Sequence, residues 1–185
     1  RKNLGFYNRK TYIKEKQFNL NKNILNLSGN LYLDGYWQSE KYFKDFENII
    51  KKDFTLKSTG SEAQKLSNVI KNTKNSLSLH IRRGDYVKDP KTNHYHGVCS
   101  MEYYENAIRY VKNQVGDVDL FIFSDGIGWA KEQELFSSAK FISSAEIKDY
   151  EEMFLMSLCE HNNIANSSFS WWGAWLNNNP NKIII

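Results

Sequence analysis

The sequence of 185 residues has few of the residues that build disulfide frameworks, linkers or membrane spans. It holds two cysteines, Cys99 and Cys159, far apart in the chain, so we expect no disulfide scaffold and a reducing compartment. Two prolines argue against a long proline-rich linker. No apolar run reaches the roughly 18 residues of a transmembrane helix. These absences favour a cytoplasmic globular protein. Peripheral association with a membrane stays open, although no basic amphipathic helix demands it.

Several familiar signatures are missing as well. The chain has no G-x-x-x-x-G-K-[ST] phosphate loop, no G-x-G-x-x-G dinucleotide fingerprint and no G-x-S-x-G nucleophile elbow. Its net charge of +4 is too mild to indicate nucleic acid, and its aromatic residues fall mostly at helix-core spacing. The charge is compatible with a small anionic ligand.

Hydrophobic periodicity divides the chain into two parts. Before residue 74 the pattern is weak. There we expect an irregular stretch over 1–30, short strands at 24–27 and 31–33, and amphipathic helices at 40–54 and 62–74, the second opened by a capping box of Ser61 and Gln64. After residue 75, strands predicted at 76–81, 120–123, 139–142, 163–165 and 182–185 alternate with helices at 101–114, 128–136, 150–159 and 169–176. This alternation predicts an α/β fold with an open parallel sheet covered on both faces, and a boundary near residues 73–76.

Polar side chains follow each predicted strand of the second part. In open parallel sheets, ligands bind beyond the carboxyl ends of the strands. The residues that reach this edge are His80, Arg82, Arg83, Gly84 and Asp85, then Ser124 and Asp125, then Ser143 and Ser144, and finally Asn166, Ser167 and Ser168. Their convergence on one edge predicts a ligand site there.

The run HIRRGD at residues 80–85 is the sharpest of these features. Arg82 and Arg83 leave a buried strand together, and Gly84 permits a tight turn. A guanidinium is a rigid fork that binds phosphate oxygens through paired hydrogen bonds. The alternative is a surface ion pair between Arg83 and Asp85, with Arg82 solvated. Because other polar residues share this edge, we favour a phosphate site.

Two further runs follow later strands. FIFSDG, at 121–126, places Asp125 where it could accept hydrogen bonds from a guanine edge or a ribose hydroxyl, or could simply form an Asp-Gly turn. NSSFSWWGAWL, at 166–176, begins with good helix-capping residues. A helix start offers free N–H groups to an anion, although an ordinary capped core helix would have the same sequence.

The residues His94, His96 and Cys99 form a short cluster that could suggest a metal site. The cluster has no fourth ligand. We therefore expect a loop that flanks the ligand, and no metal.

Taken together, HIRRGDYV, FIFSDG, DYEEMFLMSLCEHNNIANSSFSWWGAWL and GYWQSEKYF resemble the bacterial α-1,2-fucosyltransferases of glycosyltransferase family eleven. The resemblance implies a GT-B fold, with residues 1–74 as the remainder of the acceptor-side domain and 75–185 as a Rossmann-like GDP-sugar-binding domain. It implies inverting transfer of L-fucose from GDP-L-fucose to a galactoside hydroxyl, without metal or other cofactor. It also implies a bacterial polysaccharide context, hence a location in the cytoplasm or at the inner membrane.

By the same resemblance, Arg82 is the catalytic residue that holds the donor diphosphate, with His80 beside it. Asp125 is expected near the guanosine, and Ser167 and Ser168 at the phosphates. The full donor-binding set is His80, Arg82, Arg83, Asp85, Ser124, Asp125, Asn166, Ser167 and Ser168, in which Arg83 and Asp85 are expected to support the loop.

The chain departs from the family at its start, which lacks the Gly-rich GLGNQ-type loop. We therefore expect a fragment without part of the acceptor pocket. Asp85 and Asp34 are candidates for the base, as is a residue outside the chain. Two rival functions stay open: an inactive GDP-sugar-binding module, and a transferase that uses another GDP-sugar.

Overall fold

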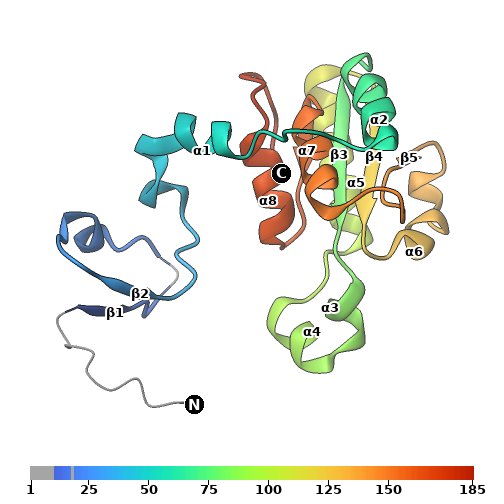
Figure 1. Ribbon diagram of the computed structural model, residues 1–185. Coiled ribbons are helices and arrows are strands. Elements are labelled where there is room, and N and C mark those ends of the chain that lie inside the picture. Colours follow the sequence, from blue (N-terminus) through green and yellow to red (C-terminus); the bar gives the residue numbers. More distant parts are fainter. Residues whose placement is uncertain (1–10, 18) are drawn as a thin grey trace. The chain divides into compact units, whose positions relative to one another are not determined.

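The computed structural model describes residues 11–17 and 19–185, and the chain divides into two compact units, 1–55 and 56–185 (Figure 1). The division falls earlier than the boundary that we expected near residues 73–76. The reason is helix α2 (Ser61–Lys71), which packs against α7 (Asp149–Leu158) of the second unit. The first ten residues, part of the stretch expected to be irregular, lie outside the described residues.

The first unit has little regular structure. Strands β1 (Tyr12–Lys14) and β2 (Tyr32–Asp34) form a parallel pair in which Tyr12 stacks on Tyr32, with ring centroids 5.6 Å apart. The predicted strand at 24–27 is wrong, since a 3-10 helix, η1 (Lys22–Asn26), stands there. The predicted helix at 40–54 is broken into three pieces, η2 (Glu40–Tyr42), η3 (Lys44–Phe46) and α1 (Glu47–Asp53). Much of its expected buried face is exposed, with Phe46 and Ile49 each 59% accessible.

The second unit is built on a four-stranded sheet in the order β5-β4-β3-β6, with every neighbouring pair parallel. The strands are β3 (Ser76–Ile81), β4 (Asp119–Ser124), β5 (Lys140–Phe141) and β6 (His161–Asn163). Of these four strands, β3 is the first in the chain but lies in the middle of the sheet. The chain adds β4 and β5 on one side of β3 and then β6 on the other, so the strand order reverses between β3 and β6. In such sheets the ligand crevice lies at this reversal, beyond the carboxyl ends of the strands.

Helices cover both faces of this sheet, as the alternation of strands and helices predicts. Leu120 and Ile122 of β4 pack with α5 (Met101–Val115) and with the segment of α6 (Ile127–Lys131) and η4 (Glu134–Phe136). Phe121 and Phe123, which alternate with them, pack on the opposite face with α2 and α7. This period-2 split of a continuous apolar run is the mark of a strand buried on both sides.

Three other features complete the second unit. Helix α8 (Ser168–Leu176) packs against α7 and β6. The strand predicted at 182–185 is reduced to a single bridge between Asn162 and Ile184. Helices α3 (Gly84–Lys88) and α4 (Pro90–His96), which the sequence did not predict, form a small lobe beyond the carboxyl end of β3 (Figure 1). Among the described residues, no helix has both the length and the apolar character to cross a membrane.

Candidate functional site

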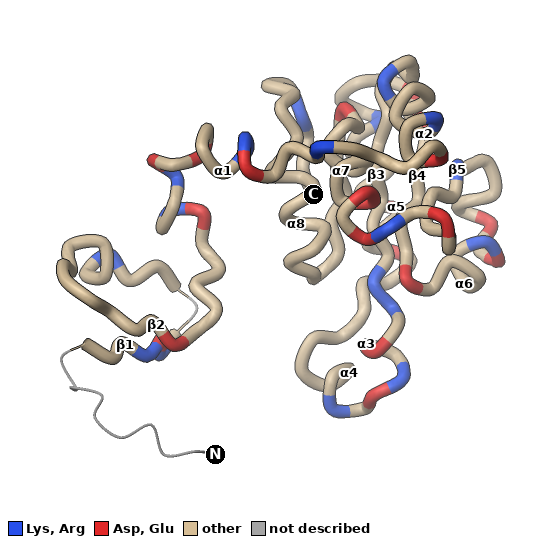
Figure 2. The backbone as a smooth tube through the Cα atoms, viewed as in Figure 1, with Lys and Arg blue, Asp and Glu red and all other residues tan. Residues whose placement is uncertain are grey.

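The candidate site is assembled where three parallel strands end. Ile81, the last residue of β3, is in register with Ser124, the last residue of β4. β6 runs parallel to β3 on the other side, with Leu79 in register with Asn163. The HIRRGD turn, the SDG turn and the segment that leads into α8 therefore leave the same edge of the sheet. Figure 2 shows basic residues where β3 leads into α3, followed directly by an acidic one.

Arg82 is held between two carboxylates. Its Nη1 lies 2.9 Å from Asp125 Oδ2, and its Nη2 lies 2.6 Å from Asp85 Oδ1. The guanidinium carbon also lies 5.2 Å from the centre of the Tyr86 ring. With 32% of its side chain accessible, Arg82 is fixed but still open to a ligand. The alternative of an Arg83–Asp85 pair with Arg82 solvated is therefore wrong, because Asp85 pairs with Arg82.

Asp125 joins the ends of β3 and β4. Besides the Arg82 contact, its Oδ1 accepts a hydrogen bond from the backbone N–H of Arg83 at 2.8 Å. Gly84 lies so close that a Cβ added there would come within 2.4 Å of Asp125 Oδ2. A larger residue at this position would therefore have to displace the Asp125 carboxylate.

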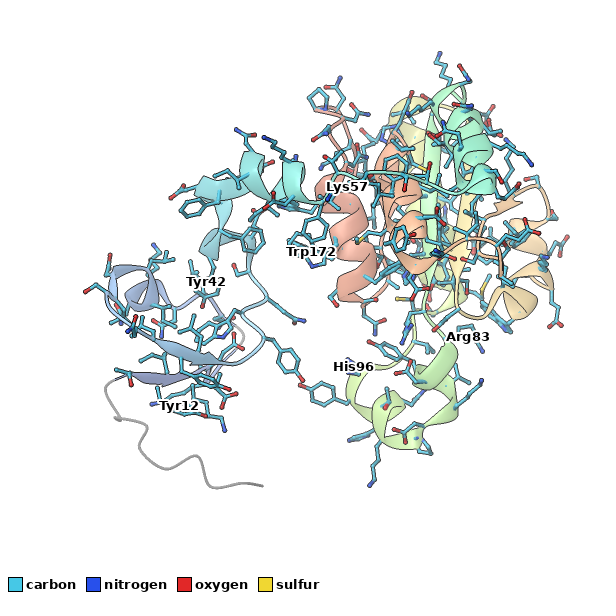
Figure 3. The ribbon with its side chains drawn as sticks, viewed as in Figure 1. Tyr12, Tyr42, Lys57, Arg83, His96 and Trp172 are labelled. Atoms are coloured by element: carbon cyan, nitrogen blue, oxygen red, sulfur yellow. The ribbon has the colours of Figure 1, made fainter. Side chains whose placement is uncertain are left out.

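The Arg83 side chain, although next to Arg82 in sequence, has a different partner. Its guanidinium carbon lies 3.8 Å from the centre of the Trp129 ring on α6, a cation–π contact. Figure 3 labels Arg83 at the junction of β3 and α3. This contact fits the expectation that Arg83 supports the turn.

His80 is buried under the same edge. Its Nδ1 is buried without a hydrogen-bond partner, and its ring centre lies 5.7 Å from that of Phe169 on α8. Burial lowers the pKa of His80 to about 4, with Asp125 opposing and Arg82 adding to the shift. The imidazole is therefore neutral at pH 7 and can donate or accept a hydrogen bond.

The start of α8 is free of side-chain capping. Its N-cap residue Ser167 is extended, and its hydroxyl makes no capping hydrogen bond. The N-cap Ser100 of α5, by contrast, accepts a hydrogen bond from the N–H of Tyr103 at 3.2 Å. The hydroxyl of Ser170 donates hydrogen bonds to the backbone carbonyls of Ala165 and Ser167, which precede it in the chain. The Ser167 side chain therefore accepts no hydrogen bond from the backbone N–H groups in the first turn of α8.

The side chains of Asn166 and Ser124 both make hydrogen bonds within the protein. The Asn166 amide donates to the carbonyls of His96 and Gly97, at 2.5 and 3.1 Å. The Ser124 hydroxyl donates to the Ile81 carbonyl at 2.8 Å and accepts from the N–H of Gly126 at 2.9 Å. Both side chains hold the edge together, and a role in binding remains a prediction for each.

Two aromatic contacts connect the HIRRGD turn with the start of α8. The Tyr86 ring, which lies under Arg82, donates its hydroxyl to the carbonyl of Asn166 at 3.3 Å. The second contact is between the rings of His80 and Phe169 on α8. The predicted phosphate-binding turn and the predicted helix start are thus neighbours in the structure.

Glu152 on α7, which the sequence analysis did not single out, interacts electrostatically with Asp125. Burial raises its pKa to about 7, and the negative charges of Asp149 and Asp125 add to this shift, while a hydrogen bond with Ser143 opposes it. A carboxyl group that titrates near neutrality beside a ligand edge is typical of a functional position. The run DYEE gave no sign of which glutamate faces the edge. Glu151, its neighbour, accepts from the backbone N–H of Gly60 at 2.6 Å and of Lys148 at 3.0 Å.

The remaining candidate residues make other contacts. His96 stacks on Tyr86, with ring centroids 4.8 Å apart. Of the two candidate bases, Asp85 is engaged by Arg82, and Asp34 accepts from the Tyr12 hydroxyl in the first unit. Across residues 11–17 and 19–185, no cluster of three or more His, Cys, Asp or Glu side chains could hold a metal ion.

Similar proteins include two curated relatives from Escherichia coli. An alpha-1,2-colitosyltransferase is 42% identical over 155 residues, which are 82% of this chain and 53% of the relative. The O-antigen biosynthesis glycosyltransferase WbnK is 34% identical over 189 residues, covering 98% of this chain and 63% of the relative. The chain thus spans between about half and two thirds of the length of these relatives.

Among solved structures, POFUT1 in complex with GDP-fucose aligns with a TM-score of 0.50 at 14% identity, over 83% of this chain and 54% of that chain. At this identity the likeness concerns the fold alone. Together with the parallel sheet, it confirms the predicted α/β fold of GT-B type. Residues 3–185 match glycosyl transferase family 11. With nearly its whole length matched and a curated relative in which 98% of it aligns, this chain belongs to glycosyl transferase family 11.

Proposed function

We propose that this chain is the donor-binding part of an enzyme that transfers L-fucose from GDP-L-fucose to a galactoside hydroxyl, forming an α-1,2 linkage. The observation that carries the proposal is the fixed guanidinium of Arg82, which Tyr86 connects to the segment before the uncapped start of α8. Both features favour a diphosphate, one through a full charge and the other through backbone N–H groups.

The proposed reaction is a single displacement with inversion at the anomeric carbon. The acceptor oxygen forms a bond to that carbon while the bond from the carbon to the β-phosphate oxygen breaks. The electron pair of the broken bond goes to GDP, and a base takes the acceptor proton. Negative charge develops on the diphosphate, where Arg82 and the first turn of α8 stabilise it without a metal.

The comparisons support the donor and the linkage. The colitosyltransferase relative is named for an α-1,2 linkage, and the aligned POFUT1 structure holds GDP-fucose. The second relative is named for O-antigen biosynthesis, which supports a polysaccharide acceptor. GDP-L-fucose and a galactose-containing glycan are therefore the substrates that we propose, with no further cofactor.

The colitosyltransferase also supports a second candidate donor, a GDP-linked colitose. Colitose is L-fucose without its 3-hydroxyl group, so the two donors differ at one polar group. A site that hydrogen-bonds a substrate hydroxyl rejects an analogue without it far more strongly than an apolar pocket rejects an added hydroxyl. Comparing kcat/KM for the GDP-linked forms of fucose, colitose and mannose, with linkage analysis of the product, separates these functions.

The test of the proposed site is Arg82→Ala in the full-length protein. We expect kcat to fall by about 10²–10³, the effect of losing one preorganised donor to a developing anion. Arg109→Ala, which removes an arginine 60% exposed on α5, is the matched control and should keep normal turnover. Near-normal GDP release by Arg82→Ala would remove this residue from the mechanism.

A further inference from the structure

We propose that Asp125 is a positioning residue: it fixes Arg82 and the turn after β3 in the geometry that receives the diphosphate, and it does not contact the nucleoside. This inference rests on the proposed function of Arg82. It also replaces our expectation that Asp125 lies at the guanosine.

Both carboxylate oxygens of Asp125 are already engaged by the HIRRGD turn. Oδ1 accepts from the backbone N–H of Arg83 at 2.8 Å, and Oδ2 lies 2.9 Å from Arg82 Nη1. One side chain from β4 thus fixes both the backbone and the guanidinium that follow β3. A nucleoside bound at Asp125 would have to compete with these contacts.

The two carboxylates around Arg82 are not equivalent. Asp85 belongs to the same turn as Arg82 and its side chain is 55% exposed, so it moves with the turn. Asp125 comes from the neighbouring strand, and its side chain is 28% exposed. Exposed ion pairs between close neighbours contribute little, whereas a less exposed contact between strands restricts the side chain more. Asp125 is therefore the main anchor of Arg82.

The backbone is shaped around this carboxylate. A Cβ at Gly84 would meet Asp125 Oδ2 at 2.4 Å, and a Cβ at Gly126 would meet Arg83 Cβ at 3.2 Å. The turn after β3 and the turn after β4 therefore approach each other as closely as side chains allow. The N–H groups of Arg82 that neither carboxylate engages are left for the oxygens of the diphosphate.

The position of the Arg82 guanidinium matters for catalysis because a misplacement of about 1 Å can cost about 10² in rate. In the full-length protein, Asp125→Asn keeps an oxygen that can accept from the Arg83 N–H but loses the charge that holds Arg82. We expect kcat/KM to fall by about 10–10² and GDP to bind more weakly. Guanosine, which has no phosphate, should inhibit as well as it inhibits the unaltered protein.

The decisive experiment is a double-mutant cycle with Arg82→Ala, read out as kcat/KM and as the inhibition constants of GDP and guanosine. Asp125→Asn should change kcat/KM less than about twofold when Arg82 is already alanine, since residues in one contact are not additive. The matched control is Asp117→Asn, which makes the same chemical change at a fully exposed carboxylate and should leave all three values unchanged.

Two results would overturn the inference alone: losses that multiply in the double variant, or a guanosine affinity that falls as much as the GDP affinity. The second would place Asp125 at the nucleoside after all. Normal turnover by Arg82→Ala, in contrast, would overturn the proposed function of the site together with this inference.

Discussion

The two halves of the candidate phosphate site achieve a similar electrostatic effect by different means. After β3, the charge sits on one side chain, Arg82, which two carboxylates and the Tyr86 ring must hold in place. At the start of α8, the N–H groups belong to the backbone, and the helix itself holds them. The full charge of Arg82 attracts an anion strongly but depends on the side chains that hold it. The N–H groups at the start of α8 attract an anion more weakly, but truncating a side chain does not remove them.

The largest effect that separates the two halves should come from Gly84→Ala. The added methyl group would meet Asp125 Oδ2 at 2.4 Å and displace the support of Arg82 without touching Arg82 itself. We expect kcat/KM to fall by about 10², with the melting temperature lowered much less. Gly128→Ala is the control, since a Cβ there meets nothing within 4 Å. Equal activity of the two variants would show that the first half does not depend on this close approach.

A smaller effect is expected from Ser168→Pro, which tests the second half. Ser168 is the first residue of α8, where proline fits and deletes one backbone N–H. Ser167 before it is already extended, with φ −134° and ψ 128°, as a residue before proline prefers. We expect GDP binding to weaken by about 10-fold, because one charge-assisted hydrogen bond is lost. Ser168→Ala removes the same hydroxyl but keeps the N–H, so it should weaken GDP binding less than Ser168→Pro does. Equal affinity of both variants would exclude the backbone N–H of the helix start as a phosphate contact.

The smallest effect concerns His80, which lies beneath both halves. Its folded-state pKa of about 4 is below the unfolded value of 6.5, so the unfolded chain binds the proton more tightly. The contribution of His80 to stability is therefore present above pH 6.5 and is lost as the pH falls toward 4. Thermal melts of His80→Asn should show a weaker decline of stability over this range, while His94→Asn on α4 should decline like the unaltered protein. An unchanged slope in His80→Asn would show that His80 is not buried as a neutral ring.

Local patterns predicted the second unit well because its elements bury the faces that their own periodicity defines. β3 matches the strand predicted at 76–81, and α5 matches the helix predicted at 101–114. α5 buries one face, formed by Tyr104, Ala107, Ile108 and Val111. The first unit is different, since Phe46 and Ile49 are regularly spaced but exposed, and the predicted helix breaks into short turns. Periodicity marks a face that could be buried, but only a covering partner stabilises the helix.

Within the site, the sequence identified the edge but not the partners. The order of strands brings HIRRGD and the start of α8 together, and this follows from parallel topology. The pairing of Arg82 rather than Arg83 with Asp85, and the link from Asp125 to Arg82, depend on side-chain directions that spacing does not encode. The raised pKa of Glu152 likewise arises mainly from burial in the folded chain, which the run DYEE does not reveal.

The central claim is tested most directly by a structure of the full-length protein with GDP bound. We predict that the diphosphate oxygens lie within hydrogen-bonding distance of the Arg82 guanidinium and of backbone N–H groups in the first turn of α8. A diphosphate bound away from Arg82, or a guanine base seated on Asp125, would contradict the account.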